Sequence, residues 1–204
     1  MKSEKGLFKV GDAKRFIRLA RKAIEYFNLT GMPYSEKVPK EEYMEKRGVF
    51  VTLHSFPNEE LRGCIGVPYP IMPLWKAIIE AAMGACRDPR FKAVSNEEME
   101  NIIVEISIMT KPEKVDKDNI EKEIEIGKHG LIIKKGSNSG LLLPQVPVEY
   151  NWSLETFLEQ TCLKAGLFPK AWKANETEVY RFGAQIFKEE KPNGKVIEVK
   201  LLKC

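Results

Sequence analysis

The feature that most constrains the fold of this chain is a pair of short apolar runs separated by turn residues. The runs cover residues 48–56 and 61–67, and the segment between them reads Pro57-Asn58-Glu59-Glu60. Two strand-like runs joined by so short a turn pair antiparallel, because parallel pairing needs a long crossover connection. The sequence therefore predicts a β-hairpin over residues 48–67.

Other segments repeat this antiparallel pattern. Apolar runs at 131–135 and 141–143 flank a Gly- and Ser-rich segment at 136–140, which predicts a second hairpin with a five-residue loop. Further strands are predicted at 102–109, 179–187 and 196–201, and helices at 12–28, 73–87 and 153–165. The segment 111–122 is predicted to be a solvated linker with a turn. Because hairpins dominate and helices fall irregularly between them, the expected class is α+β, a mainly antiparallel sheet built from hairpins with flanking helices.

Length and composition set the scale of the molecule. The chain has 204 residues, of which 43% are hydrophobic and 30% charged, as in ordinary soluble globular proteins. That length suits one large domain or two small lobes. There is no run of 18 apolar residues and no apolar core of a signal peptide near Met1, so we expect a cytoplasmic protein without membrane contact. The enrichment in Lys and Glu is typical of thermophilic proteins.

The charge pattern does not single out a polyanionic partner. The formal net charge is +4, and basic residues alternate with acidic ones along much of the chain. Such a mixture is typical of a solvated surface. The basic side of the helix predicted at 12–28 could touch a membrane or an RNA, although we expect it to be the solvated side of a packed helix.

The four cysteines are widely and irregularly spaced. They are Cys64, Cys86, Cys162 and Cys204, with no Cys-x-x-Cys pair, so no zinc site is expected. In the cytoplasm they should be reduced thiols. Cys86 and Cys162 lie in apolar helical patterns and are predicted to be core residues, whereas Cys204 ends the chain and is expected to fray.

Cys64 lies in the segment that most resembles a functional site, Leu61-Arg62-Gly63-Cys64-Ile65-Gly66. Side chains two positions apart share one face of a strand, so Arg62 and Cys64 are expected to point the same way. Gly66 would leave space beside them, and Gly63 carries no side chain on the opposite face. Since a cationic neighbour lowers the pKa of a thiol, this pattern favours a reactive or ligand-contacting cysteine.

Two histidines and one glutamate could assist Cys64. His54 lies in the preceding strand, and His129 lies between two glycines at the entrance to the second predicted hairpin. A Cys–His pair is the minimum for thiolate catalysis, but a lone histidine is more often a hydrogen-bonded structural residue. Glu149 follows a segment stiffened by two prolines and could orient a histidine or bind a cationic group, or could equally be a surface residue. Asp88 and Arg90 are predicted to form an ion pair within their loop rather than to bind a substrate.

Together these residues resemble the AMMECR family, whose hallmark is the Leu61–Gly66 motif. Supporting matches are Arg87-Asp88-Pro89-Arg90-Phe91, Gly127-x-His129-Gly130, and Leu143-Pro144-Gln145-Val146 followed by Glu149 and Trp152. The resemblance implies one domain over residues 1–204 with a larger and a smaller lobe, and a cleft near which the motif residues gather. It also implies an association with Memo-like and radical-SAM proteins. The family is not tied to one reaction, so the resemblance implies fold more than function.

Three interpretations of the motif remain open. In the first, the protein is an enzyme of thiol chemistry in a modification pathway, with Cys64 as nucleophile, His129 as base and Glu149 as its orienting group. In the second, it is a binding module for an anionic ligand such as a nucleotide or RNA, or for a partner protein. The ligand-binding residues would be Arg62, Gly63, Gly66, Asp88, Arg90 and Gln145.

In the third interpretation the motif is purely structural, and Arg62 forms a buried pair with Glu149 or another acid. The sequence does not name a substrate, a cofactor or an oligomeric state, and it predicts no metal site.

Overall fold

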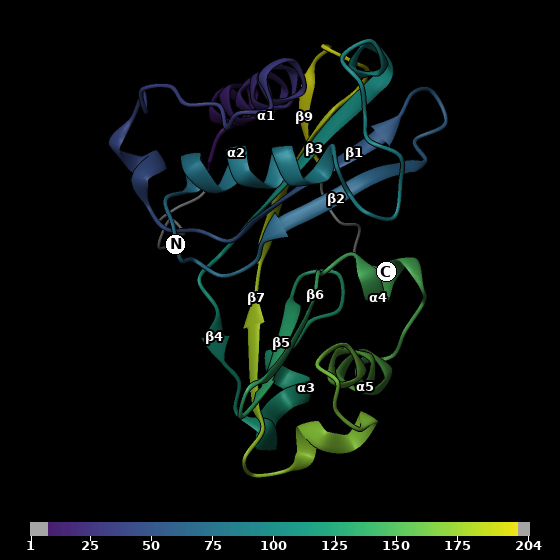
Figure 1. The fold of residues 1–204 in the computed structure, drawn as a ribbon. Helices are drawn as coiled ribbons and strands as arrows, with labels where there is room; N and C mark the ends of the chain where they lie inside the picture. The colour runs from purple at the N-terminus through teal and green to yellow at the C-terminus, as the bar shows by residue number, and fades with distance from the viewer. Residues whose placement is uncertain (1–7, 200–204) are drawn as a thin grey trace. The chain divides into compact units, whose positions relative to one another are not determined.

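The structure of the protein, a computed structural model, describes residues 8–199 and divides them into two compact units (Figure 1). The first unit contains residues 8–109 and 185–199, and the second contains residues 110–184. Each unit has its own hydrophobic core. None of the helices within residues 8–199 is long and apolar enough to cross a membrane.

The first unit is a five-stranded sheet covered on one face by two helices. The strand order is β2-β1-β3-β8-β9. β1 pairs antiparallel with β2 and β3, and β8 pairs antiparallel with β9. Helix α2 packs on β1 and β2, and α1 packs on α2, β3 and β9 (Figure 1). The elements are α1 (Val10–Thr30), β1 (Val49–Ser55), β2 (Leu61–Val67), α2 (Leu74–Ala85), β3 (Ile102–Met109), β8 (Ala184–Glu189) and β9 (Val196–Val199), with 3₁₀ turns η1 (Glu41–Met44) and η2 (Glu98–Asn101).

Alternation along β1 separates the two faces of this sheet. Val49, Val51 and Leu53 are fully buried in the core that α1 and α2 cover. Successive strand residues point to opposite faces, so Thr52 and His54 lie on the face opposite the helices. The sheet thus has one apolar, helix-covered face and one face with polar side chains.

The second unit is a smaller α+β structure. Its four-stranded antiparallel sheet has the order β4-β7-β5-β6. Helix α5 begins at an N-cap, Ser153, whose side chain accepts from the Thr156 backbone N–H, and Gly166 follows it with a φ of 71°. The elements are β4 (Glu113–Lys114), η3 (Lys117–Asn119), α3 (Ile120–Glu123), β5 (Gly130–Lys135), β6 (Asn138–Leu142), α4 (Val146–Glu149), α5 (Leu154–Lys164), η4 (Pro169–Lys173) and β7 (Glu178–Phe182).

The predicted α+β class with mainly antiparallel pairing is confirmed, and the strands predicted at 61–67 and 102–109 match β2 and β3 residue for residue. One predicted element is wrong. The single strand expected at 179–187 breaks at Gly183 into β7 and β8, which belong to different sheets. The segment 111–122, predicted to be a linker with a turn, also contains the short strand β4, the 3₁₀ turn η3 and the start of α3.

The second hairpin is tighter than the predicted five-residue loop. Lys135 pairs with Asn138, which leaves a two-residue turn in which Gly136 has a φ of 58°. Gly140 lies inside β6, where a Cβ atom would be 2.4 Å from the backbone nitrogen of Ala165. That glycine therefore permits close packing of α5 rather than loop flexibility. The last two residues of the strand predicted at 196–201, and Cys204, lie outside the described residues.

Candidate functional site

Cys64 lies on β2, at the edge of the five-stranded sheet, and a neighbouring loop binds its backbone. The Cys64 N–H donates to Asp88 Oδ2 at 2.9 Å, and Arg90 Nη2 donates to the Cys64 carbonyl at 3.4 Å. Arg90 and Asp88 also form the predicted ion pair, at 2.6 Å. The loop after α2 thus satisfies the outward-facing backbone groups of the edge strand.

Asp88 is fully engaged in these contacts. Its side chain is 1% exposed and also accepts from the backbone N–H of Arg90. The hydrogen bonds from the Arg90 side chain, helped by the backbone N–H groups of Cys64 and Arg90, hold the pKa of the Asp88 carboxyl well below its usual range. Asp88 is therefore ionised and already partnered, which fits the predicted structural role better than a ligand contact.

The two glycines of the motif permit close packing. A Cβ atom on Gly63 would lie 2.2 Å from the Ala85 carbonyl oxygen at the end of α2. A Cβ atom on Gly66 would lie 2.4 Å from the ring of Phe50. The expected empty space beside Cys64 is therefore filled at Gly66 by an aromatic ring. Packing alone explains why neither position carries a side chain.

Arg62 does not share the surroundings of Cys64, which corrects the prediction from strand alternation. The register between β1 and β2 shifts at His54, leaving Arg62 as an extra residue in a β-bulge. Its Nε and Nη2 donate to the Glu98 carboxylate at 2.6 and 3.1 Å. Arg62 therefore has an acidic partner, as the structural interpretation predicts, but that partner is Glu98 and not Glu149.

The Cys64 thiol is not activated in this environment. Thr52 Oγ1 donates to Cys64 Sγ at 3.3 Å. Burial raises the pKa of the Cys64 thiol above its ordinary value, and the charges of Glu105 and Asp88 raise it further. The Thr52 hydrogen bond and the Arg90 charge act in the opposite direction but are outweighed. The predicted lowering of the thiol pKa by a neighbouring arginine is therefore wrong.

A row of polar side chains crosses the sheet on the face opposite the helices. Thr52 is paired with Cys64 on one side and with Glu105 on the other. His54 Nε2 lies 3.7 Å from Glu105 Oε2, and Ser107 lies two residues further along β3. We call the five residues Thr52, His54, Cys64, Glu105 and Ser107 the polar face.

Three polar atoms of this face are buried without a hydrogen-bond partner among the described residues. They are Nδ1 and Nε2 of His54 and Oγ of Ser107. The side chains of His54 and Glu105 are 20% and 16% exposed. Buried polar groups in native proteins are nearly always hydrogen-bonded, so these atoms indicate an incomplete network.

Thr52, Glu105 and Ser107 were not predicted as site residues, although the sequence of β3 carries one signal for two of them. β3 reads Ile-Ile-Val-Glu-Ile-Ser-Ile-Met, so two polar residues two positions apart interrupt an otherwise apolar strand. That spacing places Glu105 and Ser107 on a single face. Combined with His54 on β1, it could have located the polar face.

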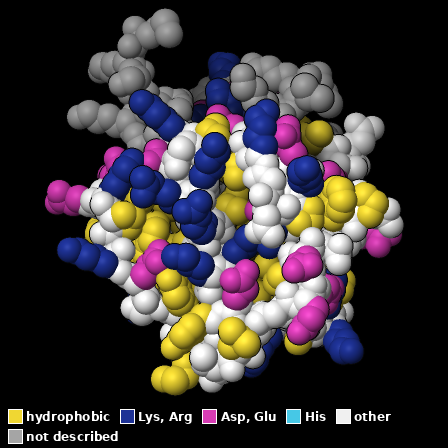
Figure 2. Space-filling view, turned by 90° about the horizontal axis from the view of Figure 1, so that it is seen from above, with side chains coloured by type: hydrophobic (Ala, Val, Ile, Leu, Met, Phe, Trp, Pro, Cys, Tyr) yellow, Lys and Arg dark blue, Asp and Glu magenta, His cyan; other side chains and the backbone are white. Residues whose placement is uncertain are grey.

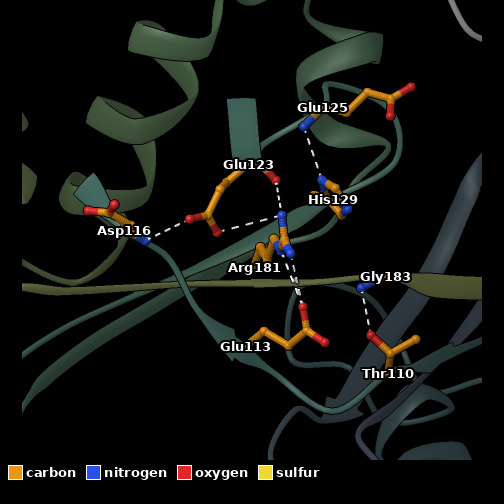
Figure 3. Close-up of polar contacts among 8 residues, drawn as sticks. All are labelled: Thr110, Glu113, Asp116, Glu123, Glu125, His129, Arg181 and Gly183. Atoms are coloured by element: carbon orange, nitrogen blue, oxygen red, sulfur yellow. Dashed lines mark hydrogen bonds and ion pairs between the residues drawn. The ribbon is translucent and has the colours of Figure 1, made fainter. Parts of the chain in front are cut away.

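In the second unit, His129 is held in one orientation (Figure 3). The backbone N–H of Glu125 donates to His129 Nδ1 at 3.0 Å. Burial, assisted by the charges of Arg181 and Lys128, lowers the pKa of His129. A neutral imidazole that accepts at Nδ1 carries its proton on Nε2, so His129 offers a hydrogen-bond donor there rather than the lone pair that a base needs.

Arg181 beside it is fully engaged (Figure 3). Its Nη1 donates to the Glu123 carbonyl at 2.5 Å, and its Nη2 lies 3.2 Å from Glu113 Oε2. Close by, Gly183 donates to Thr110 Oγ1 at 2.8 Å and accepts from the Thr110 N–H at 2.9 Å. Arg181 and Gly183 therefore have hydrogen-bond partners within the second unit, and these bonds hold the end of β7 in place.

Gln145 and Glu149 bracket α4. Glu149 is exposed, and its backbone N–H donates to the Gln145 carbonyl at 3.0 Å. Gln145 Oε1 is buried without a hydrogen-bond partner among the described residues. Both residues, like His129, belong to the second unit, whereas Cys64 belongs to the first. The catalytic set of Cys64, His129 and Glu149 stays a prediction.

No group of three or more His, Cys, Asp or Glu side chains within residues 8–199 could hold a metal ion. The fold and the site together define a two-sheet α+β protein with a cysteine-bearing edge strand clamped by an Asp-Pro-Arg loop. The AMMECR1 family pattern matches residues 17–187, and the chain belongs to this family.

Similar proteins come from archaea and from Aquifex. A protein of Methanocaldococcus jannaschii, MJ0810, is 53% identical over 91% of this chain and 94% of its own length. An Aquifex aeolicus protein is 52% identical over 81% of this chain and 88% of its own length. The crystal structure of the uncharacterized protein PH0010 from Pyrococcus horikoshii has a TM-score of 0.87 at 46% identity and covers 95% of this chain and 99% of that one. These thermophilic sources agree with the enrichment in Lys and Glu.

Proposed function

We propose that this protein binds a ligand on the polar face of its first unit. The observation that carries the proposal is the set of buried atoms of His54 and Ser107 that have no hydrogen-bond partner among the described residues. Leaving a buried polar group without a partner costs about 1–3 kcal/mol, a penalty that a complementary ligand would relieve. Because the residues of the polar face lie on three neighbouring strands, the fold holds them in place before a ligand arrives.

The charges around the polar face favour a ligand that donates hydrogen bonds. The Glu105 carboxylate makes no hydrogen bond among the described residues, and its nearest basic neighbour is His54 at 3.7 Å. Arg62 is committed to Glu98, and Arg90 is committed to Asp88. This arrangement supports an ammonium or guanidinium group better than the anionic ligand considered in the second interpretation of the motif.

Amide NMR with two fragments of opposite charge tests this proposal. We expect n-butylammonium to shift the amide signals of Thr52 and Cys64 saturably, and n-butyrate and inorganic phosphate to leave them unchanged. The Glu105→Gln variant should lose the response, whereas Glu121→Gln, which removes an exposed acid in the second unit, should keep it. Saturable shifts with butyrate or phosphate instead, or none with butylammonium, would overturn the proposal.

Thiol chemistry is the second candidate, and one observation favours it. Cys64, His54 and Glu105 lie on one face of one unit, which gives a thiol, an imidazole and a carboxylate in neighbouring positions. Such a set is a nucleophile, a base and an orienting acid. The raised pKa of Cys64 opposes this role, because catalysis needs the thiolate.

Alkylation of Cys64 by iodoacetamide against pH, followed by mass spectrometry of the native protein, separates the two candidates. If the polar face only binds, the alkylation midpoint should lie above the free-thiol pKa of about 8.5. A midpoint well below that value would favour the thiol enzyme. Cys64→Ser should retain butylammonium binding under the first proposal.

A further inference from the structure

The exposed side of α1 carries a row of cations. Lys14, Arg15, Arg18 and Lys22 are exposed, and Glu25 is the one exposed acid of this helix. Figure 2 views the molecule from the side on which α1 lies in Figure 1 and shows Lys and Arg side chains gathered over that helix, with few acidic ones among them. The local excess of positive charge is therefore larger than the net charge of the chain suggests.

Helix stability does not account for this row. Lys14, Arg18 and Lys22 are spaced four residues apart, so they lie on one side of the helix about 6 Å from one another. Like charges at this spacing repel and destabilise a helix. The row also lies in the first two-thirds of α1, and the last turn has no basic residue, the reverse of what the helix dipole favours.

Ion pairing does not account for it either. Lys22 is bonded to Glu36 at 3.1 Å, but Lys14, Arg15 and Arg18 make no hydrogen bond or ion pair with any described residue. Three neighbouring cations are therefore available to a ligand from solution.

We propose that this face of α1 binds the phosphodiester backbone of a nucleic acid. Exposed cations in a row neutralise phosphates and release their counterions, which is the general source of affinity for nucleic acids. The apolar side of α1, including Phe16, Ala20 and Ile24, is fully buried in the core. An interfacial membrane helix needs that side to enter the lipid, so the same helix cannot insert in a bilayer in that way.

Fluorescence anisotropy with a labelled 20-base-pair RNA duplex, and the DNA duplex of the same sequence, tests the proposal between 50 and 200 mM KCl. Three phosphate contacts predict that the logarithm of the affinity falls against that of the salt concentration with a slope of about −2 to −3. Arg15→Gln/Arg18→Gln should weaken binding roughly five- to thirtyfold and reduce the slope by about two. Equal affinity for the RNA and DNA duplexes would mean that the protein recognises the phosphodiester backbone that both share. Binding to only one duplex would identify that nucleic acid as the ligand.

The matched control is Lys164→Gln/Lys170→Gln, which removes the same charge from exposed positions of the second unit. It should leave binding within twofold. Equal weakening by both double variants would mean attraction to overall charge and would overturn the proposal. Binding to phosphatidylserine vesicles without binding to either duplex would overturn it in favour of a membrane surface. Circular dichroism of the α1 variant should be unchanged, because the substitutions remove repulsion.

Discussion

Two buried polar clusters lie on opposite faces of the five-stranded sheet and differ in their hydrogen bonding: the Arg21–Glu189 pair is satisfied, whereas His54 and Ser107 on the polar face are not satisfied by any described residue. On the helix-covered side, Arg21 and Glu189 are 7% and 3% exposed and are joined by two hydrogen bonds of 2.9 and 2.7 Å. Arg21 also donates to the Met99 and Ile102 carbonyls, and Glu189 accepts from the Val104 N–H. On the polar face, His54 and Ser107 have no such partners among the described residues.

The difference indicates two uses of buried polarity. A network whose donors and acceptors are all matched within the chain needs nothing from outside, so its role is to hold elements together. It joins α1 to β8, which are far apart in the sequence. A network that remains unmatched lowers stability unless something else completes it, which is the physical basis of the proposed ligand site.

The largest effect should follow from breaking the Arg21–Glu189 pair. Arg21→Met leaves the Glu189 carboxylate buried without its cation, so we expect a loss of about 3–5 kcal/mol in the free energy of unfolding, measured by urea titration. The double variant Arg21→Met/Glu189→Leu removes both charges and should recover most of that loss. If Arg21→Met alone loses less than about 1 kcal/mol in the free energy of unfolding, water reaches the ion pair. The contrast between this pair and the polar face would then not hold.

A second effect concerns the loop that clamps Cys64. Asp88→Asn keeps the shape of the side chain but removes the charge that binds Arg90 and the Cys64 N–H. We therefore expect the free energy of unfolding to fall by about 2–3 kcal/mol at pH 7. The folded pKa of Asp88 is depressed, so its stabilisation is complete above the unfolded pKa of about 3.9 and is lost as pH falls toward the folded value.

Urea titrations of the wild type and Asp88→Asn at pH 7 and pH 3 check this sign. The stability gap between them should be smaller at pH 3, because the unfolded wild-type chain then binds a proton at Asp88 that the folded chain does not. Asp118→Asn, at an exposed position in the second unit, should show little effect at either pH. A gap that is independent of pH would mean that Asp88 acts through shape rather than charge.

The sequence predicted the elements better than it predicted the site. Strands and hairpins follow from local patterns, and β2 and β3 match their predictions because turn residues bound them. The partner of Arg62 does not follow, because one bulged residue changes the direction of a side chain and Glu98 lies 36 positions away. The break at Gly183 divides one apolar run between two sheets, which periodicity alone does not reveal.

The pKa of Cys64 illustrates a further limit. An adjacent arginine in the sequence predicts a lowered thiol pKa, but burial dominates and raises it. Burial depends on what packs around the strand, and this information lies in residues distant along the chain. The polar face could have been predicted more readily than the pKa of Cys64, because the alternation of β3 already places Glu105 and Ser107 on one face.

The smallest effect, and the most informative, should have the opposite sign from the others. Ser107→Ala removes a buried hydroxyl that has no hydrogen-bond partner among the described residues. We therefore expect the free energy of unfolding to rise by about 0.5–1 kcal/mol. The matched variant is Thr161→Val, which removes a fully buried hydroxyl that donates to the Phe157 carbonyl at 2.7 Å. That variant should lose about 1 kcal/mol.

Thermal and urea unfolding of the two variants, without added ligand, give the comparison its sharpest form. If the two variants change the free energy of unfolding in opposite directions, the buried Ser107 hydroxyl destabilises the folded chain, as expected of a group that awaits a ligand. Two losses of equal size mean that Ser107 is satisfied in solution, and the polar face then loses the observation on which its proposed role rests. Adding n-butylammonium should reduce the difference in free energy of unfolding between Ser107→Ala and the wild type, because the ligand stabilises the wild type more than the variant.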